Sequence, residues 1–300
     1  MYNFRMPNVP KKKERYVYSN KPKPYNKVCF GIRGQFGDIV MQEPGLRKFI
    51  QDNPDTKIVF AVSEPYKDIL PLFENYHENI IGFKVWEGYN DWPTEADRQY
   101  MEEEQFCALF PPDIPLHPEA DWARRRHITT ETALMIGVTS DDTDIQLKMP
   151  EGVTKEPKTV ALHLFSSKYP GGTRSVSIEK QNQIVEYVRN KGYKVYQLSA
   201  PHQPRIANTV FSEGNYFDAC KRMLSTDLLI TCDSGMPWVA SGFNHPMIGL
   251  YSSAYNHLIG TTKNWQPVNP NAVYLEAPLA NDIPIEWITE QIDKRLENLT

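Results

Sequence analysis

The sequence predicts an α/β protein with two parallel β-sheets, each covered by helices on both faces. Short apolar runs alternate with amphipathic stretches in both halves of the 300-residue chain, which is the pattern of repeated strand–helix–strand units. A chain of this length can also bury two separate cores. No apolar run approaches the roughly 20 residues of a membrane-spanning helix, so we expect no stable insertion into a membrane.

The first half begins with the apolar run Val28–Ile32, which predicts a buried strand. A polar turn and then a helical pattern follow it, and the helical pattern continues to Ile50. Residues 86–120 interleave aromatic side chains with acids and prolines, and the loss of a clean period predicts an insertion or a long loop. The other elements expected in this half are strands at 57–62 and 80–85 and helices at 66–76 and 128–136.

The second half repeats this alternation after a segment with the composition of a linker. Residues 149–157 combine Pro, Gly and charged residues, which is typical of a connection between domains. We therefore expect an N-terminal arm at 1–26, a first Rossmann-like domain at 27–152 and a second at 153–300. The elements expected in the second domain are strands at 159–164, 194–198, 228–230 and 247–251, a helix at 177–190 and a closing C-terminal helix at 285–299.

The N-terminal arm is strongly basic, although the whole chain is slightly acidic. Residues 1–27 hold eight basic residues and one acidic residue, a net charge of +7, so the rest carries −11 of the total of −4. An arm of this kind is either a solvated tail or a contact for an anionic partner.

Several classes of protein are excluded by what the sequence lacks. The four cysteines lie far apart without paired spacing, which argues against a disulfide framework or a zinc site. No cluster of His, Asp and Glu has the spacing of metal ligands, so we expect no metal. The N-terminus has no apolar stretch of the signal-peptide type, which favours a cytoplasmic location.

The segment Thr231–Trp238 lies between two apolar runs and predicts a strand, a tight turn and a helix. Its Asp-Ser-Gly turn leaves backbone N–H groups unpaired at the start of the helix, where the helix dipole favours an anion such as a phosphate. The same residue types are also typical of a simple helix N-cap. The turn alone therefore leaves both interpretations open.

Three short motifs, taken together, resemble those of a known enzyme family. They are Gly37-Asp38-Ile39-Val40 after the first strand, Leu162-His163-Leu164 leading to Arg174, and Asp233-Ser234-Gly235. In their order and spacing the chain is similar to the GT-B glycosyltransferases, and more narrowly to the ADP-heptose lipopolysaccharide heptosyltransferases of glycosyltransferase family nine. The resemblance implies two Rossmann-like domains whose parallel sheets face a central cleft. It also implies an inverting sugar transfer, with the acceptor on the first domain and a nucleotide-diphosphate sugar on the second.

The resemblance assigns one carboxylate and several phosphate contacts. Asp38 matches the family's general base, which takes the proton of the acceptor hydroxyl, and its alternative role is a helix N-cap. Arg174 lies where the family places a basic residue on the donor diphosphate, and Lys168 is a candidate to share or replace that role. Asp233 is either a ligand to a donor hydroxyl or a cap of its own turn. The backbone amides expected at the diphosphate are those of Ser234, Gly235 and Met236.

One residue departs from the family pattern and bears on the donor. Trp238 stands where the family usually has a His, so a cation is replaced by a ring that would pack on the sugar or the base. The resemblance implies a nucleotide-diphosphate sugar as co-substrate and no separate cofactor. The residues expected to contact the acceptor are Arg33, Gln35, Trp86 and Trp92.

The acceptor has two interpretations. A basic arm suits a lipid-linked oligosaccharide at the inner face of the membrane. The same arm and the cluster Arg124–Arg126 also suit DNA, as do the aromatic residues Trp86, Tyr89 and Trp92. A viral enzyme that glycosylates hydroxymethylated bases in an infected host cell would have such features.

Two other classes of function would require different residues from those of a glycosyltransferase. A non-catalytic sensor of sugar nucleotides would keep Arg174 and the Ser234 turn without needing Asp38. A nicotinamide dehydrogenase would need the spacing G-x-G-x-x-G, whereas Gly31, Gly34 and Gly37 give G-x-x-G-x-x-G. The presence of Asp38 favours an enzyme over the sensor.

Overall fold

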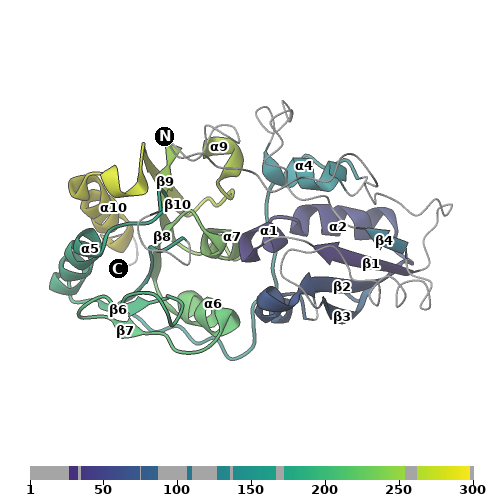
Figure 1. Ribbon diagram of the computed structural model, residues 1–300, viewed down its shortest axis with the longest axis horizontal. Helices are drawn as coiled ribbons and strands as arrows, with labels where there is room; N and C mark the ends of the chain where they lie inside the picture. The colour runs from purple at the N-terminus through teal and green to yellow at the C-terminus, as the bar shows by residue number, and fades with distance from the viewer. Residues whose placement is uncertain are drawn as a thin grey trace, which may run out of the picture.

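The computed structural model describes residues 27–32, 35–74, 76–86, 107–109, 127–135, 138–166, 172–253 and 262–297, which form two lobes lying side by side (Figure 1). The N-terminal lobe contains the elements up to helix α4, and the C-terminal lobe contains those from strand β5 onward. Each lobe is built around its own parallel sheet, so the predicted α/β class is confirmed. Among these residues, no helix combines the length and the hydropathy that crossing a bilayer requires.

The N-terminal sheet has the strand order β3-β2-β1-β4, and all its neighbouring strands are parallel. Residues 28–30 of β1 and 58–63 of β2 are buried, as expected for parallel strands covered on both faces. Phe30 and Phe60 stack at the centre of the sheet, with ring centroids 6.1 Å apart. The elements are β1 (Lys27–Ile32), α1 (Phe36–Val40), α2 (Glu43–Asp52), β2 (Lys57–Ser63), η1 (Glu64–Leu72), β3 (Ile80–Trp86), β4 (Cys107–Leu109) and α4 (Ile128–Met135).

Three features of this lobe differ from the sequence-based expectation. The region expected to be a loop contains strand β4, which pairs with β1 at the edge of the sheet. The helical pattern expected through Ile50 is divided into α1 and α2 at Met41, and Pro44 lies in the first turn of α2, where a missing N–H costs least. The helix expected at 66–76 is the 3-10 helix η1, and Pro71 inside it cannot donate the bond that an α-helix needs there.

The C-terminal sheet has the strand order β10-β9-β8-β5-β6-β7, again with every pairing parallel. In chain order this is the doubly wound Rossmann arrangement, and the direction of winding reverses between β5 and β8. The elements are β5 (Thr159–His163), α5 (Ile178–Asn190), β6 (Lys194–Gln197), β7 (Val210–Phe211), α6 (Tyr216–Ser225), β8 (Leu228–Cys232), α7 (Gly235–Ser241), β9 (Met247–Ser252), α9 (Thr262–Trp265), β10 (Ala272–Ala277), η2 (Ala280–Asp282) and α10 (Ile285–Glu297).

The closing helix expected at the C-terminus is confirmed as α10. Its apolar face, which includes Ile288 and Ile292, packs in one buried cluster with Ile184 and Val188 of α5. The two helices therefore cover the same face of the C-terminal sheet, at the end of the molecule away from the N-terminal lobe (Figure 1).

The two lobes share a buried apolar cluster. The cluster extends from the core of the N-terminal lobe, where it includes Phe30 and Ile39, to Met223 of α6 and to Met236 and Trp238 of α7. In Figure 1, α1 and α7 meet at the boundary between the lobes. Burial of apolar side chains from both lobes at one boundary favours a fixed arrangement of the lobes.

The chain that connects α4 to the second lobe also lies against both lobes. Its Leu147 N–H donates to the carbonyl of Gly242 at the end of α7, at 3.1 Å. A Cβ atom on Gly242 would lie 2.8 Å from Leu147 Cδ1, so the connection packs directly on this glycine. The domain boundary expected near residue 152 stays a prediction.

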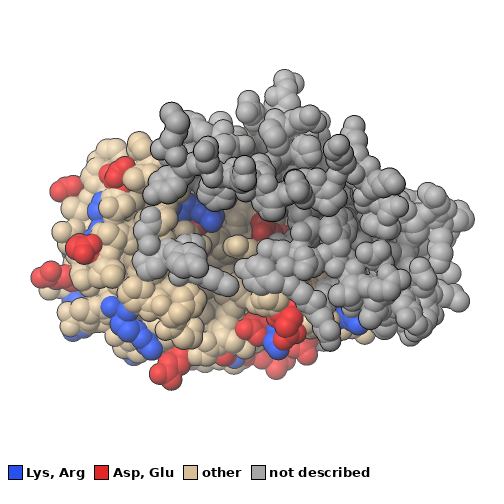
Figure 2. Space-filling view, in the orientation of Figure 1, with Lys and Arg blue, Asp and Glu red and all other residues tan. Residues whose placement is uncertain are grey.

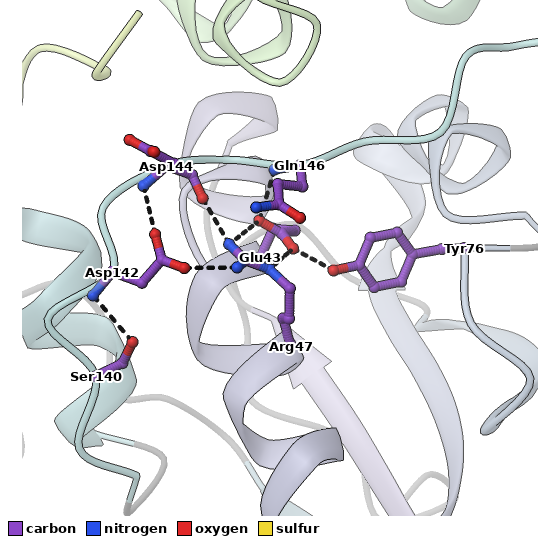
Figure 3. A network of polar contacts seen from close by, with 7 residues as sticks. All are labelled: Glu43, Arg47, Tyr76, Ser140, Asp142, Asp144 and Gln146. Carbon is purple, nitrogen blue, oxygen red and sulfur yellow. Dashed lines mark hydrogen bonds and ion pairs between the residues drawn. The ribbon is translucent and has the colours of Figure 1, made fainter.

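A buried carboxylate fastens this connection to the N-terminal lobe (Figure 3). Glu43 of α2 is only 1% exposed. Its oxygens accept hydrogen bonds from Nε of Arg47 at 2.8 Å, from the backbone N–H of Gln146 at 2.9 Å and from the hydroxyl of Tyr76. Arg47 in turn donates to the Asp142 carboxylate at 2.5 Å and to the Asp144 carbonyl at 2.6 Å. The segment 142–146 is thus held on α2 by charge-assisted hydrogen bonds.

Candidate functional site

Three polar residues gather where strands β5 and β8 end. Strand β5 ends at His163, and β8 ends at Cys232, directly before Asp233 and Ser234. These two strands are neighbours, and the sheet order reverses between them. Ligands of doubly wound sheets bind in the crevice at such a reversal, outside the carboxyl ends of the strands.

Arg174 and Asp233 form an ion pair at this edge of the sheet. Nη1 of Arg174 lies 3.7 Å from Oδ2 of Asp233, and both side chains are largely buried. Burial raises the pKa of Asp233, and the positive charge of Arg174 opposes that rise. Arg174 is therefore held in place on the sheet edge, in contrast to the solvated loop cation that a single arginine often is.

The hydroxyl of Ser234 is used inside the turn. Ser234 is the N-cap residue of α7, yet its side chain makes no capping hydrogen bond. Its Oγ instead lies 3.2 Å from Nδ1 of His163 and 3.2 Å from the carbonyl oxygen of Cys232. Burial lowers the pKa of His163 to about 4, so this ring is neutral near pH 7.

Asp38 lies in the first turn of α1, the helix that follows β1 in the other lobe. Its Oδ2 accepts the backbone N–H of Gln35 at 2.7 Å, and the side-chain amide of Gln42 donates to its carbonyl oxygen at 3.0 Å. The N-cap residue of α1 is Gln35, so the alternative role of Asp38 as the N-cap itself is wrong. Asp38 is the third residue of the helix, and its carboxylate accepts from the N-cap backbone as in a capping box. An ionised carboxylate has about four acceptor positions, and the bond from Gln35 orients this one at the start of α1.

The two turns meet at a pair of glycines. A Cβ atom on Gly37 would lie 3.2 Å from Cα of Gly235, and a Cβ atom on Gly235 would lie 3.0 Å from the backbone nitrogen of Gly37. Only residues without side chains allow the backbones of α1 and α7 to approach this closely. Asp38 and Ser234 each lie one residue from this contact, so the structure brings the two sequence motifs together.

Aromatic rings surround the glycine contact. Phe36 stacks on Tyr216 of α6 with ring centroids 3.6 Å apart, and Tyr66 meets Phe36 edge to face. Trp238 is 3% exposed, and its Cδ1 would lie 3.2 Å from a Cβ atom on Gly37. The suggestion that the Trp238 ring packs on a sugar or base is wrong, because its faces are buried between the lobes.

Solved structures of glycosyltransferases share this architecture. The ADP-heptose lipopolysaccharide heptosyltransferase II of E. coli aligns with a TM-score of 0.68 at 13% identity, over 90% of this chain and 99% of that chain. A glycosyl transferase family 9 protein from Veillonella parvula aligns with a TM-score of 0.65 at 16% identity, over 92% and 97%. The chain has the GT-B fold. The E. coli heptosyltransferase WaaC, solved with ADP, aligns with a TM-score of 0.60 at 12% identity, over 90% and 99%. No protein-family model and no curated protein matches the sequence.

Of the residues expected to contact the acceptor, Gln35 and Trp86 lie at different places in the N-terminal lobe. Gln35 is exposed and lies beside Asp38, to which its backbone N–H donates. Trp86 is the last residue of β3, the edge strand of the N-terminal sheet, two strands from β1. Arg33 and Trp92, like the donor candidate Lys168, lie outside the described residues.

Two further polar side chains lie at or near the carboxyl ends of strands in the C-terminal sheet. Gln197 ends β6, and its side chain donates to Ser199 and Pro204 and accepts from Ile206, so it is used in folding the loop after β6. Tyr251, near Asp233 in β9, is fully buried, and its hydroxyl has no hydrogen-bond partner among the described residues. Within the same residues, no three His, Cys, Asp or Glu side chains cluster as metal ligands.

Proposed function

We propose that this protein transfers a sugar from a nucleotide-diphosphate sugar to an acceptor hydroxyl, with inversion at the anomeric carbon. The observation that carries the proposal is the contact between Gly37 and Gly235, which places the turn with Asp38 against the turn with Asp233 and Ser234. Each turn follows a central strand of its own sheet, in the position where doubly wound folds bind ligands. The shared fold with heptosyltransferases supports a sugar nucleotide as the donor.

The reaction assigns one step to each lobe. Asp38 accepts the proton of the acceptor hydroxyl while that oxygen forms a bond to the anomeric carbon. The bond from this carbon to the diphosphate breaks at the same time, and the nucleoside diphosphate leaves with the electron pair. Arg174, held by Asp233 at 3.7 Å, stabilises the charge that develops on the leaving group. Attack from the side opposite the diphosphate inverts the anomeric centre.

A panel of nucleotide-diphosphate sugars, each added to the purified protein in a thermal-shift assay, tests this function. A ligand that binds the folded state raises the melting temperature in proportion to RT ln(1 + [L]/Kd). We expect at least one member of the panel to raise the melting temperature, and the best one to serve as donor. If every member leaves the melting temperature unchanged at millimolar concentration, the proposed function is wrong.

Arg174→Ala is expected to weaken binding of this donor and also to lower turnover. A charge-assisted bond to a phosphate is worth about 1.5–3 kcal/mol, which corresponds to a loss of roughly ten- to a hundredfold in affinity. Titration calorimetry with the donor measures the first effect, and a coupled assay for the released nucleoside diphosphate measures the second. Arg295→Ala, on α10 at the far end of the lobe, is the matched control and should bind normally. Equal affinities for the two variants would contradict the role of Arg174.

The acceptor is proposed to be anionic, either a lipid-linked oligosaccharide or DNA. The described part of the face in Figure 2 intersperses Lys and Arg with Asp and Glu, and the basic arm at 1–26 supports an anionic acceptor by its charge. Binding of labelled duplex DNA over a salt series separates the two acceptors, because phosphate contacts give a steep loss of affinity with salt. Failure to bind at low salt excludes DNA and favours the oligosaccharide.

The proposal requires no metal ion or separate cofactor. In this mechanism a guanidinium supplies the positive charge at the leaving group that a divalent ion supplies in other transferases. Turnover measured after dialysis against EDTA is expected to stay within about twofold of the untreated enzyme. Loss of activity in EDTA that Mg²⁺ or Mn²⁺ restores would show that a metal takes part.

A further inference from the structure

His163 occupies the end of β5 and has no role in the reaction as described above. Nδ1 of its ring lies 3.2 Å from the hydroxyl oxygen of Ser234, which follows the neighbouring strand β8. Ser234 is the residue that joins Asp233 to the glycine contact with α1. A half-buried polar side chain at this point is therefore placed to act on the turn.

The proton of the Ser234 hydroxyl determines which ring nitrogen of His163 carries hydrogen. The hydroxyl has one proton, and it donates to the carbonyl oxygen of Cys232 at 3.2 Å. When the hydroxyl proton is directed at that carbonyl, Nδ1 of His163 is the donor to Ser234 Oγ and Nε2 is an acceptor.

We infer that His163 is a positioning residue, whose Nδ1–H holds the Ser234 hydroxyl and so fixes the turn from Asp233 to Gly235 against α1. The inference rests on the proposed function, because it assigns that turn to donor binding. The anchored hydroxyl keeps Ser234 in its extended conformation, with φ −160° and ψ −168°. The carbonyl oxygen of Ser234 would lie 3.5 Å from a Cβ atom on Gly37. A displaced turn would therefore change the junction between the lobes.

Two substitutions test which ring nitrogen of His163 supplies the hydrogen bond to Ser234. The side-chain amide of His163→Asn places an N–H near the position of Nδ1, whereas that of His163→Gln places it near the position of Nε2. We expect His163→Gln to weaken donor binding by about five- to tenfold, as for the loss of one hydrogen bond, and His163→Asn to bind like the wild type. His77→Gln is the matched control, because His77 is exposed and lies before β3, at the opposite end of its sheet from the Asp38 turn.

The donor affinities separate positioning from a merely structural effect. All variants are compared at equal folded fraction, verified by thermal unfolding. If His163 positions the turn, His163→Gln raises the Kd for the donor, and it raises the KM for the donor by a larger factor than it lowers kcat. His163→Asn then has the Kd and KM of the wild type. Equal losses in the Asn and Gln variants, or no loss in either, would overturn the inference.

A double-mutant cycle with Ser234→Ala tests whether the two side chains act together. Removal of the hydroxyl leaves the backbone amide of Ser234 in place and should weaken donor binding by about the same factor as His163→Gln. If His163 acts through Ser234, the double variant loses no more than the larger single loss. If the two losses multiply, the residues act independently and the inference is wrong.

The tautomer of His163 is measured without any ligand. Long-range ¹⁵N–¹H correlation spectra of protein labelled on histidine, assigned by comparison with the His163→Asn variant, report which ring nitrogen is protonated. We expect the Nδ1–H form, and the Nε2–H form would overturn the inference. The result also separates two kinds of failure, because a protein that binds no nucleotide sugar refutes the proposed function while the spectrum still decides the state of His163.

Discussion

Asp38→Asn is expected to lower turnover by about a hundred- to ten-thousandfold, the contribution of a general base, while the affinity for the donor stays within about twofold. Asparagine matches aspartate in size and its amide oxygen can still accept the backbone N–H of Gln35. It cannot take a proton from an acceptor hydroxyl. Asp38→Ala should lose the same activity and, in addition, the capping bond.

Titration calorimetry and steady-state kinetics on the same preparations measure the two quantities. Asp52→Asn, at the exposed end of α2, is the matched control and should keep full turnover. Near-normal turnover in Asp38→Asn would show that another group is the base. A loss of donor affinity equal to the loss of turnover would place Asp38 in donor binding and not in proton transfer.

Glu43→Ala is expected to lower the free energy of unfolding by about 3 kcal/mol, because it breaks a buried ion pair by removing one partner. Arg47 would keep its ion pair with Asp142 but lose its ion pair with residue 43 of the same helix. The hydroxyl of Tyr76 and the N–H of Gln146 would each lose a buried acceptor (Figure 3).

Urea-induced unfolding measures this effect, and Asp52→Ala provides the comparison. Asp52 pairs with Lys48 at 2.6 Å on the same helix, and both side chains are over a third exposed. Removing this exposed pair should change the free energy of unfolding by no more than about 0.5 kcal/mol. Similar results for the two variants would mean that the Glu43 network does not hold the connection between the lobes.

The central strands and the edge strand β3 were predictable from the sequence, whereas the other three edge strands were not. Strands β1, β2, β8 and β9 are continuous apolar runs because both of their faces are buried. The strands missed are β4, with three residues, β7, with two, and β10, whose residues are mostly half-exposed. Short or half-exposed edge strands carry too few apolar residues to give a clear period.

Helix α6 was also missed, although the sequence holds a signal for it. Asn215 caps the helix by accepting from the N–H of Asp218, and the Asp218 carboxylate accepts from the N–H of Asn215. This reciprocal pair is visible in the sequence as Asn followed three residues later by Asp. The expected pattern of capping residues therefore identifies α6 where apolar periodicity alone does not.

The candidate site was predictable residue by residue but not as an arrangement. The motifs around Asp38 and Asp233 suggested their chemistry, but the direct contact of Gly37 with Gly235 depends on how the two lobes pack. The same packing buries Trp238, which a single motif cannot reveal. The pairing of Arg174 with Asp233 likewise joins residues 59 positions apart in sequence, from a loop and a strand end.

The proposed function requires that the Asp38 segment and the turn 233–236 form one site. A crystal structure of the protein with the best donor of the thermal-shift panel tests this requirement most directly. We expect the diphosphate within hydrogen-bond distance of Arg174 and of the turn 234–236, and the anomeric carbon facing the carboxylate of Asp38. A nucleotide bound away from the β8–α7 turn, or a sugar that points away from α1, would contradict a shared site at the junction of the lobes.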